Sequence, residues 1–525
     1  MKTKPDPVQL EIFNNLYQFI AEQMGIVLQN TAVSVNIKER LDFSCAIFDS
    51  SGSLVANAPH IPVHLGSMSE SVLSLIKDKQ ATIEPGNVYL SNNPYNGGTH
   101  LPDVTAITPV FLNSRSDSSI APIKPLFYVA SRGHQADIGG ITPGSMPPNS
   151  VNIEEEGILF DNFLLVEAGQ FREAEVKEIL ANHKYPARNI KQNIADFQAQ
   201  VAANNRGKQE LQKMVDKYSL ETVRNYMGFV QNNAEESVKK VIEVLQDGEF
   251  TVQLDNEARI VIKISIDRKN RRATIDFTRT SSQLDNNFNA PSAVTQAAVL
   301  YVFRTLVTDN IPLNAGCLKP LSIIIPQGCM LNPVYPAAVV AGNVETSQQI
   351  TNCLYGALGI MAASQGTMNN FTFGNEKYQY YETICGGSGA GNSYHGTDAI
   401  QTHMTNSRLT DPEVLELRYP VLLESFNIRS NSGGRGKYNG GNGVIRKVRF
   451  LEEMTAGILS GNRLNTPFGL QGGTSGQAGK NYVIKKDGKV KQLDSTATEK
   501  MSSGDTFIIE TPGGGGFGEP STNFE

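Results

Sequence analysis

The spacing of apolar residues predicts a helix near the beginning of the chain. From residue 7 to about residue 29, apolar side chains recur at intervals of three and four positions. They are Leu10, Phe13, Leu16, Ile20 and Met24. Residues at this spacing share one face of an α-helix, so we expect an amphipathic helix that buries this face.

The pattern changes after this helix. Between residues 42 and 109, short apolar stretches such as FSCAIFD and NVYLSN alternate with the turn-forming clusters DSSGS, EPGN and NNPYNGG. This alternation predicts a sheet whose strands are joined by loops. Such loops frequently carry functional side chains.

Later regions have other patterns. Residues 173–247 are rich in Ala, Glu, Lys, Gln and Asn and are interrupted early by Pro186, which predicts two or three long helices. Apolar residues then alternate with polar ones on both sides of the DRKN turn, as in a β-hairpin. Residues 290–310 and 347–366 resemble apolar helices, and residues 430–518 are glycine-rich and strand-like.

These patterns predict a mixed α/β chain of the α+β class with several layers. A chain of 525 residues is too long for one ordinary domain. We expect an N-terminal mixed region at residues 1–172 that holds the functional site, a helical block at 173–248, and a C-terminal mixed, glycine-rich region at 249–525.

Composition narrows the class of partner. The net charge of -6 and the pI near 5.8 give no general attraction to phosphate backbones, so nucleic acid is not an expected partner. The sequence has no signal-like N-terminal segment and no apolar run of about 18 residues, so we expect a soluble cytoplasmic protein without a membrane partner. The five cysteines include no CxxC pair and are expected to be reduced and mostly buried.

Histidines supply the main chemical clue. Four of the seven lie within the first 134 residues, and two of these, His100 and His134, begin HxxD motifs that end at Asp103 and Asp137. Glycine pairs flank both motifs, so the two loops could converge on one metal ion. Imidazole and carboxylate ligands suit Zn, Mn or Fe. Alternatively, each histidine and aspartate form only a structural hydrogen-bonded pair.

Other polar residues have two possible roles each. His60 and His64 are four residues apart, but Pro62 between them disfavours a regular helix there. We expect these two histidines, together with Arg132, to bind substrate or to support the pocket. Glu39 is a candidate carboxylate ligand, although an ion pair within the KERLD segment is the simpler interpretation.

Neither glycine-rich motif predicts nucleotide binding. TPGGGGFG at residues 511–518 lacks the lysine of a GxxxxGK[ST] loop, and GGSGAG at 386–391 does not fit GxGxxG. We therefore expect TPGGGGFG to be a close-packed backbone loop near a pocket, and we expect ATP to bind elsewhere.

Several long motifs resemble those of the hydantoinase B family, which includes the B half of 5-oxoprolinase, N-methylhydantoinase B subunits and subunits of acetone carboxylases. The resemblance covers nearly the whole chain. The motifs are DPVQLEIFNN, NIKERLDFSCAIFD, APHIPVHLGSM, NNPYNGGTHLPD, SRGHQADIGGITPGSMPP, GNVETSQQI, HMTNSRLTDPEVLELRYP and TPGGGGFG.

The resemblance implies a division of labour. A partner ATPase subunit of the hydantoinase A type would phosphorylate a small cyclic amide, and this chain would open the ring, giving glutamate from 5-oxoproline or the corresponding product from a hydantoin. It also implies a divalent metal on His100, Asp103 and His134, with Glu39 as an additional ligand. His134 and Asp137 would then be catalytic, Asp137 by orienting His134 or by accepting a proton from water.

Two other functions fit the same resemblance. The chain could belong to an ATP-dependent ketone carboxylase, or it could be a non-catalytic scaffold for an ATPase. The length of the chain, that of a stand-alone B subunit, disfavours the carboxylases, whose related subunits tend to be longer. The ATPase partner that the resemblance implies makes a hetero-oligomer the expected assembly.

Overall fold

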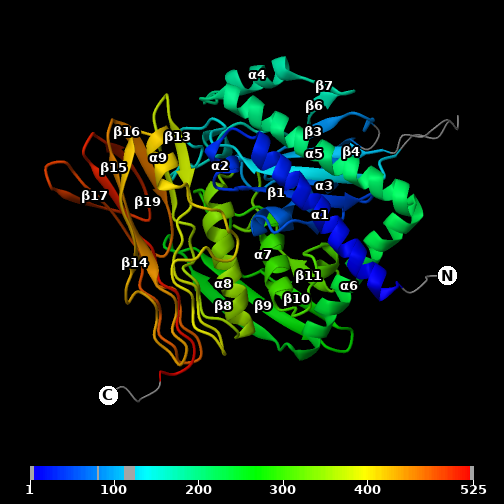
Figure 1. Ribbon diagram of the computed structural model, residues 1–525. Coiled ribbons are helices and arrows are strands. Elements are labelled where there is room, and N and C mark those ends of the chain that lie inside the picture. The colour runs from blue at the N-terminus through cyan, green and yellow to red at the C-terminus, as the bar shows by residue number, and fades with distance from the viewer. Residues whose placement is uncertain (1–4, 80–81, 112–123, 521–525) are drawn as a thin grey trace.

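The computed structural model describes residues 5–79, 82–111 and 124–520. This part of the chain forms four sheets and a series of helices, and the predicted α+β class is confirmed. The helices and the largest sheet fill most of the molecule, while the C-terminal sheets form a separate slab on the left of Figure 1. No helix in these described ranges combines the length and apolar character needed to cross a bilayer.

The N-terminal region contains a seven-stranded antiparallel sheet with the order β2-β1-β5-β4-β3-β6-β7. Its strands are β1 (Phe43–Asp49), β2 (Leu54–Asn57), β3 (Val88–Ser91), β4 (Asp103–Val110), β5 (Phe127–His134), β6 (Phe163–Glu167) and β7 (Gln170–Phe171). The central strands β1, β4 and β5 are almost wholly buried, because helices cover both faces of the sheet.

Alternate residues of β1 show how the two faces are covered. Cys45 and Ile47 pack into one core with the helices α1 (Pro7–Thr31), α5 (Ile190–Tyr218) and α6 (Leu220–Val244). Ala46 and Phe48 pack into another core with α3 (Pro62–Lys79). The period-two alternation of a strand therefore separates two helical layers.

The helices confirm the sequence pattern. The predicted N-terminal helix is α1, and its start is fixed by Pro7 and by Asp6, whose side chain accepts a hydrogen bond from the backbone N–H of Val8 at 2.9 Å. The central block forms α4 (Glu173–Ala181), α5 and α6, with Pro186 in the connection between α4 and α5. A single turn, α2 (Val35–Lys38), precedes β1.

A second layer follows the helical block. Strands β8 (Gly248–Gln253), β9 (Arg259–Asp267), β10 (Arg272–Asp276) and β11 (Leu321–Ile324) form a sheet, and the predicted hairpin is the β9–β10 pair. Helices α7 (Ser292–Thr305) and α8 (Ser347–Leu358) belong to the same core. Helix α8 is shorter than predicted, because Gly359 adopts the left-handed conformation that ends a helix.

Two further sheets form the C-terminal slab. One contains β12 (Asn370–Gly374), β13 (Gln379–Glu382), β16 (Met454–Leu459) and β19 (Thr496–Met501). The other contains β14 (Val421–Arg429), β15 (Gly443–Phe450), β17 (Lys480–Ile484), β18 (Val490–Leu493) and β20 (Thr506–Glu510), and α9 (Pro412–Arg418) precedes it. A buried ion pair joins the two sheets, with Arg446 Nε 2.6 Å from Glu382 Oε1.

The glycine-rich segments pack backbone against backbone beside these sheets. A Cβ atom added to Gly514 would overlap the carbonyl oxygen of Ser388, and one added to Gly441 would overlap that of Thr397. The backbone N–H of Gly514 donates to the carbonyl of Gly441 at 2.9 Å. TPGGGGFG is therefore a close-packed loop as predicted, because any side chain larger than hydrogen would separate the segments.

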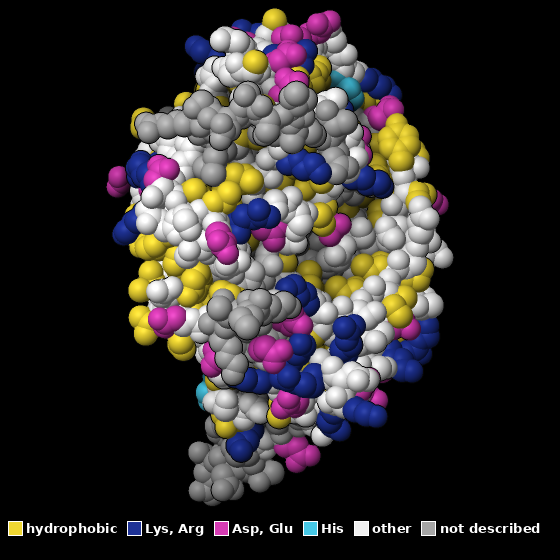
Figure 2. Space-filling model, turned by 90° about the vertical axis from the view of Figure 1, so that its right-hand side faces the viewer, with side chains coloured by type: hydrophobic (Ala, Val, Ile, Leu, Met, Phe, Trp, Pro, Cys, Tyr) yellow, Lys and Arg dark blue, Asp and Glu magenta, His cyan; other side chains and the backbone are white. Residues whose placement is uncertain are grey.

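The largest hydrophobic core joins all three predicted regions, since it contains Met146, Ala234 and Val294. The division into 1–172, 173–248 and 249–525 stays a prediction. All five cysteines are free and buried, as expected. On the face shown in Figure 2, basic and acidic side chains are interspersed, and neither sign of charge dominates.

Candidate metal centre

Strand register brings the two HxxD motifs together. Strand β4 begins at Asp103 and the antiparallel strand β5 ends at His134, and these two residues lie directly opposite each other in the ladder. Opposed residues of neighbouring strands have Cβ atoms about 5 Å apart. His100 precedes β4 in a tight turn, in which the backbone N–H of Asp103 donates to the carbonyl of His100 at 3.1 Å.

Three imidazoles converge on the carboxylate of Asp103. Its Oδ1 lies 3.1 Å from His100 Nε2 and 3.1 Å from His134 Nδ1. Its Oδ2 lies 3.1 Å from His64 Nε2. All four side chains are buried. The cluster therefore combines residues of a loop, two strands and the first turn of α3.

The donor set fits a divalent metal. One ligand atom from each of His100, Asp103 and His134 lies within 4.8 Å of the others. Two ligands bound at about 2.1 Å and separated by about 90–100° would lie about 3 Å apart, close to the distances seen here. His100 Nδ1 and His134 Nε2 are buried without a hydrogen-bond partner among the described residues, and His100 Nε2 has only its contact with Asp103. An ion would satisfy these atoms, which are costly to bury unpaired.

The electrostatics of the cluster also suit a cation. Burial alone would raise the pKa of Asp103, but the charges of His100 and His64 and the hydrogen bonds from His100 and His134 hold it well below its usual range. Burial lowers the pKa of His134 despite its contact with Asp103. Asp103 is therefore an anion and His134 a neutral imidazole, the forms in which these side chains bind metals.

Sequence reasoning did not assign a role to two residues that support the cluster. Asn343 Nδ2 donates to Asp103 Oδ2 at 3.1 Å from the π-helical turn η3 (Gly342–Thr346). Tyr381 stacks on His134, with ring centroids 4.6 Å apart. A π-helical turn is often found at a functional site. Among the quoted motifs, GNVETSQQI contains Asn343, but its local sequence did not indicate this contact.

The space at the cluster is small. The cavity has a volume of about 10 Å³, and its lining includes Ile61, Val344, Met368 and Met404. That volume is close to the minimum that holds one water molecule. An ion fits this space, whereas a cyclic amide does not fit unless the cavity opens.

The structure separates the roles expected of His60 and His64. Pro62 begins α3, so it starts a helix instead of preventing one, and His64 lies in the first turn and reaches Asp103. His60 precedes the helix, and its Nδ1 accepts a hydrogen bond from the backbone N–H of Cys45 at 3.0 Å.

Arg132 does not line the cavity at the cluster. Its guanidinium donates to Thr105 Oγ1, Ser67 Oγ and Ser71 Oγ at 2.6–2.8 Å, and it is fully buried. Burial lowers its pKa to about 10. These contacts indicate a structural cation near Asp103, which disfavours the expected contact with substrate.

Asp137 and Glu39 lie away from the expected positions. Asp137 accepts hydrogen bonds from the backbone N–H groups of Gly139 and Gly144 and pairs with Arg188 at 2.8 Å, so it stabilises a turn and does not orient His134. Glu39 lies 3.8 Å from Arg418 and is not part of the metal-binding group found among the described residues. The ion pair within KERLD is formed instead by Arg40 and Asp42, at 3.6 Å.

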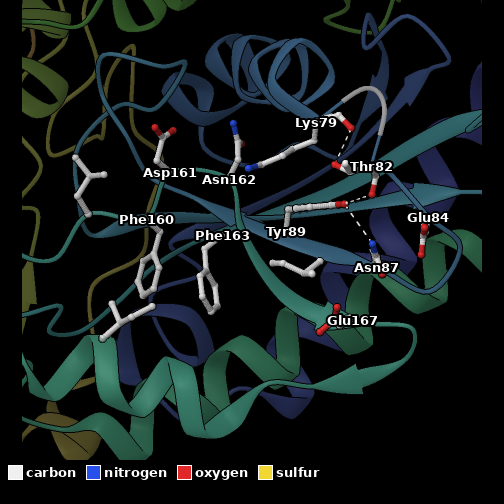
Figure 3. Close-up of a pocket in the computed structure, with 13 residues that line it drawn as sticks. Lys79, Thr82, Glu84, Asn87, Tyr89, Phe160, Asp161, Asn162, Phe163 and Glu167 are labelled. Atoms are coloured by element: carbon white, nitrogen blue, oxygen red, sulfur yellow. Dashed lines mark hydrogen bonds between the residues drawn. The ribbon is translucent and has the colours of Figure 1, made fainter.

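A larger surface cavity, of about 550 Å³, lies at the end of α3 and beside β3 and β6 (Figure 3). Some of its polar groups bond to one another: the hydroxyl of Tyr89 donates to the carbonyl of Thr82 and accepts from Asn87 Nδ2, both at 3.3 Å. It has no histidine in its lining. The metal cluster is therefore the better candidate for the functional site.

The fold of this chain is shared with two enzymes of known structure. It superposes on an ATP-dependent caprolactamase from Pseudomonas jessenii with a TM-score of 0.87 and 21% identity, covering 98% of this chain and 92% of that one. An acetone carboxylase gives a TM-score of 0.86 at 16% identity, covering 98% and 76%. These likenesses show the shared fold.

Sequence comparison identifies the family. The Hydantoinase B/oxoprolinase family matches residues 6–520, and the chain belongs to this family. It is 47% identical to 5-oxoprolinase 1 of Arabidopsis thaliana over 537 residues. That alignment covers 98% of this chain but 42% of the plant protein, so the chain spans about two fifths of the length of this relative.

Proposed function

We propose that this chain is the metal-binding part of an ATP-dependent hydrolase that opens a small cyclic amide. The observation that carries the proposal is the convergence of His64, His100 and His134 on the buried Asp103, in a chain closely related to proteins named 5-oxoprolinase. 5-Oxoproline is the first candidate substrate, with glutamate as the product, and a hydantoin is the second.

The chemistry explains why such an enzyme needs both ATP and a metal. The carbonyl carbon of a five-membered lactam is a poor electrophile, and phosphorylation of its oxygen turns that oxygen into a better leaving group. A divalent cation supplies Lewis acidity and lowers the pKa of a water molecule. The sequence contains no phosphate-binding motif, so we assign ATP to a hydantoinase A-type ATPase partner, either a separate subunit or a fused domain.

The residues of this chain would perform the remaining tasks. The anionic Asp103, together with His100 and His134, would hold the cation, while His64 and Asn343 fix the carboxylate in place. Tyr381 covers one face of His134 and prevents that ring from turning. The apolar residues of the lining, Ile61, Val344, Met368 and Met404, would limit the access of bulk water and protect an activated phosphorylated substrate from unproductive hydrolysis.

The test is a substrate panel with the chain reconstituted with its ATPase partner. ADP release and product formation are measured with 5-oxoproline, hydantoin, N-methylhydantoin, and acetone plus bicarbonate. We expect ADP release together with a ring-opened product from one cyclic amide. Turnover only with ketone and bicarbonate would contradict the proposal and assign the chain to ketone carboxylation.

The scaffold hypothesis is tested with His100→Ala in the same complex. If the histidines were only structural, the variant would assemble with the ATPase and retain activity. We expect assembly to persist and product formation to be lost.

A further inference from the structure

A second cavity lies directly behind the metal centre. It has a volume of about 430 Å³ and is lined by residues of α1, of the segment that follows α2, and of the chain around His60 and Arg408. Its volume falls in the range of small-molecule sites, about 300–1,000 Å³. In contrast to the cavity at the metal cluster, it could hold a small cyclic amide.

The two cavities share a wall one residue thick. Three chain segments each place one residue on the metal side and a residue adjacent in sequence on the other side. These pairs are Asp42 and Phe43, Ile61 and His60, and Thr405 and Asn406. Because consecutive residues line opposite spaces at three separate points, the outer cavity lies against the metal centre.

Few hydrogen bonds connect two of the segments in this wall, residues 60–63 and residues 404–406. Asn406 Nδ2 donates to the carbonyl of His60 at 3.2 Å. The backbone N–H of Val63 donates to the carbonyl of Met404 at 3.3 Å. A separation of these segments would therefore break two long hydrogen bonds and would join the cavities.

The outer cavity has the chemistry to bind a carboxylated ring. Arg408 is exposed there and forms no ion pair with any residue in the described ranges. Ile26, Leu41 and Phe43 supply an apolar surface, and Glu22 contributes the one carboxylate of the lining. His60 is uncharged at neutral pH, because burial lowers its pKa to about 4. Arg408 is thus the cation available to an anionic ligand.

We propose that this outer cavity is the entry site for a cyclic amide that carries a carboxylate, and that Arg408 binds the carboxylate before the ring passes to the metal centre. The inference rests on the proposed function and specifies its substrate class. A guanidinium and a carboxylate form a bidentate, charge-assisted pair, which gives both affinity and orientation.

Recognition is tested with Arg408→Gln in the complex with the ATPase, using 5-oxoproline and 2-pyrrolidinone, which is the same ring without the carboxylate. We expect KM for 5-oxoproline to rise about 10- to 100-fold, the factor expected of one charge-assisted hydrogen bond, with kcat changed less than about twofold. KM for 2-pyrrolidinone should not change. The matched control is Arg224→Gln on the exposed face of α6, which should leave both values unchanged.

The route is tested separately with Ile26→Trp, which fills the outer cavity from α1. We expect kcat/KM to fall for both lactams while the metal content is unchanged. Phe19→Trp on the same exposed face of α1, outside the cavity lining, is the control and should retain activity. Full activity of Ile26→Trp would overturn the proposed route.

Calorimetric binding of 5-oxoproline to the same complexes separates this inference from the proposed function. A wild-type complex that turns over no lactam contradicts the proposed function. Equal affinity of wild type and Arg408→Gln for 5-oxoproline, or no affinity in either, overturns the entry site. A loss of affinity confined to Arg408→Gln supports it.

Discussion

Asp103 and Asp137 occupy the same position in the two HxxD motifs, but their surroundings differ. Replacing each with asparagine therefore separates a metal ligand from a structural carboxylate. Asp103 contacts three imidazoles and accepts hydrogen bonds from Thr99 Oγ1 at 2.9 Å and from Asn343 at 3.1 Å. Asparagine keeps the shape but removes the charge that holds the cation. We expect Asp103→Asn to lose the metal and Asp137→Asn to retain it.

The size of the effect follows from the contacts. Loss of a residue that supports a ligand lowers metal affinity about 10- to 100-fold. Loss of a charged ligand should therefore lower metal affinity at least about 100-fold, which corresponds to about 2.7 kcal/mol of binding free energy. Wild type at a metal concentration of 100 times Kd is stabilised by about 2.7 kcal/mol, and the variant at that concentration by about 0.4 kcal/mol. Asp137→Asn should instead lose about 1–3 kcal/mol of stability, because Arg188 is left without its buried partner.

The assay combines elemental analysis with thermal unfolding, each with and without a chelator. Chelation should lower Tm clearly in wild type and in Asp137→Asn, but only slightly in Asp103→Asn. Equal metal content in wild type and Asp103→Asn would refute the assignment of Asp103. Metal loss in Asp137→Asn alone would show that the second motif binds the ion.

Three further results are expected. Asn343→Ala should weaken metal affinity about 10- to 100-fold in a competition titration without unfolding the chain, because the Asn343 amide only positions Asp103. Unchanged affinity would show that this hydrogen bond is incidental. Glu39→Gln should leave metal content unchanged and shift the free energy of unfolding by less than about 1 kcal/mol, since the ion pair of Glu39 with Arg418 is partly exposed. Loss of metal would show that Glu39 is a ligand after all. Burial lowers the pKa of His403 to about 3, so the stability gained from its neutral form is present above about pH 6.5 and is lost as pH falls toward 3. His403→Asn, which tolerates the positive φ of this position, should therefore lose less Tm than wild type between pH 7 and 5, and equal slopes would contradict this.

The sequence predicted those parts of the fold that depend on local periodicity. Helix α1, the helical block broken near Pro186, and the β9–β10 hairpin each have a pattern that neighbouring residues complete by themselves. The end of α8 was missed, because a single left-handed glycine, Gly359, decided it against a continuing apolar pattern.

The candidate site was only partly predictable. The motifs indicated that His100, Asp103 and His134 belong together, because turn-flanked strands bring such residues to one edge of a sheet. The position of Asp137 depends on Arg188, 51 residues away, and no local pattern encodes that contact.

Two other contacts with Asp103 were not predicted from the sequence, each for a different reason. Asn343 reaches Asp103 across 240 residues, from a π-helical turn that has no recognised local signature. The helix that carries His64 was missed because Pro62 was taken as a helix breaker, whereas proline is well suited to the first position of a helix.

The central claim is that ring opening depends on a metal held by this chain. It is tested most directly by measuring lactam-dependent product formation in the reconstituted complex before chelation, after chelation, and after a divalent metal is restored. The account predicts loss of product after chelation and recovery at about one ion per chain, with no recovery in His100→Ala. Undiminished product formation by wild type from which the metal has been removed would contradict it.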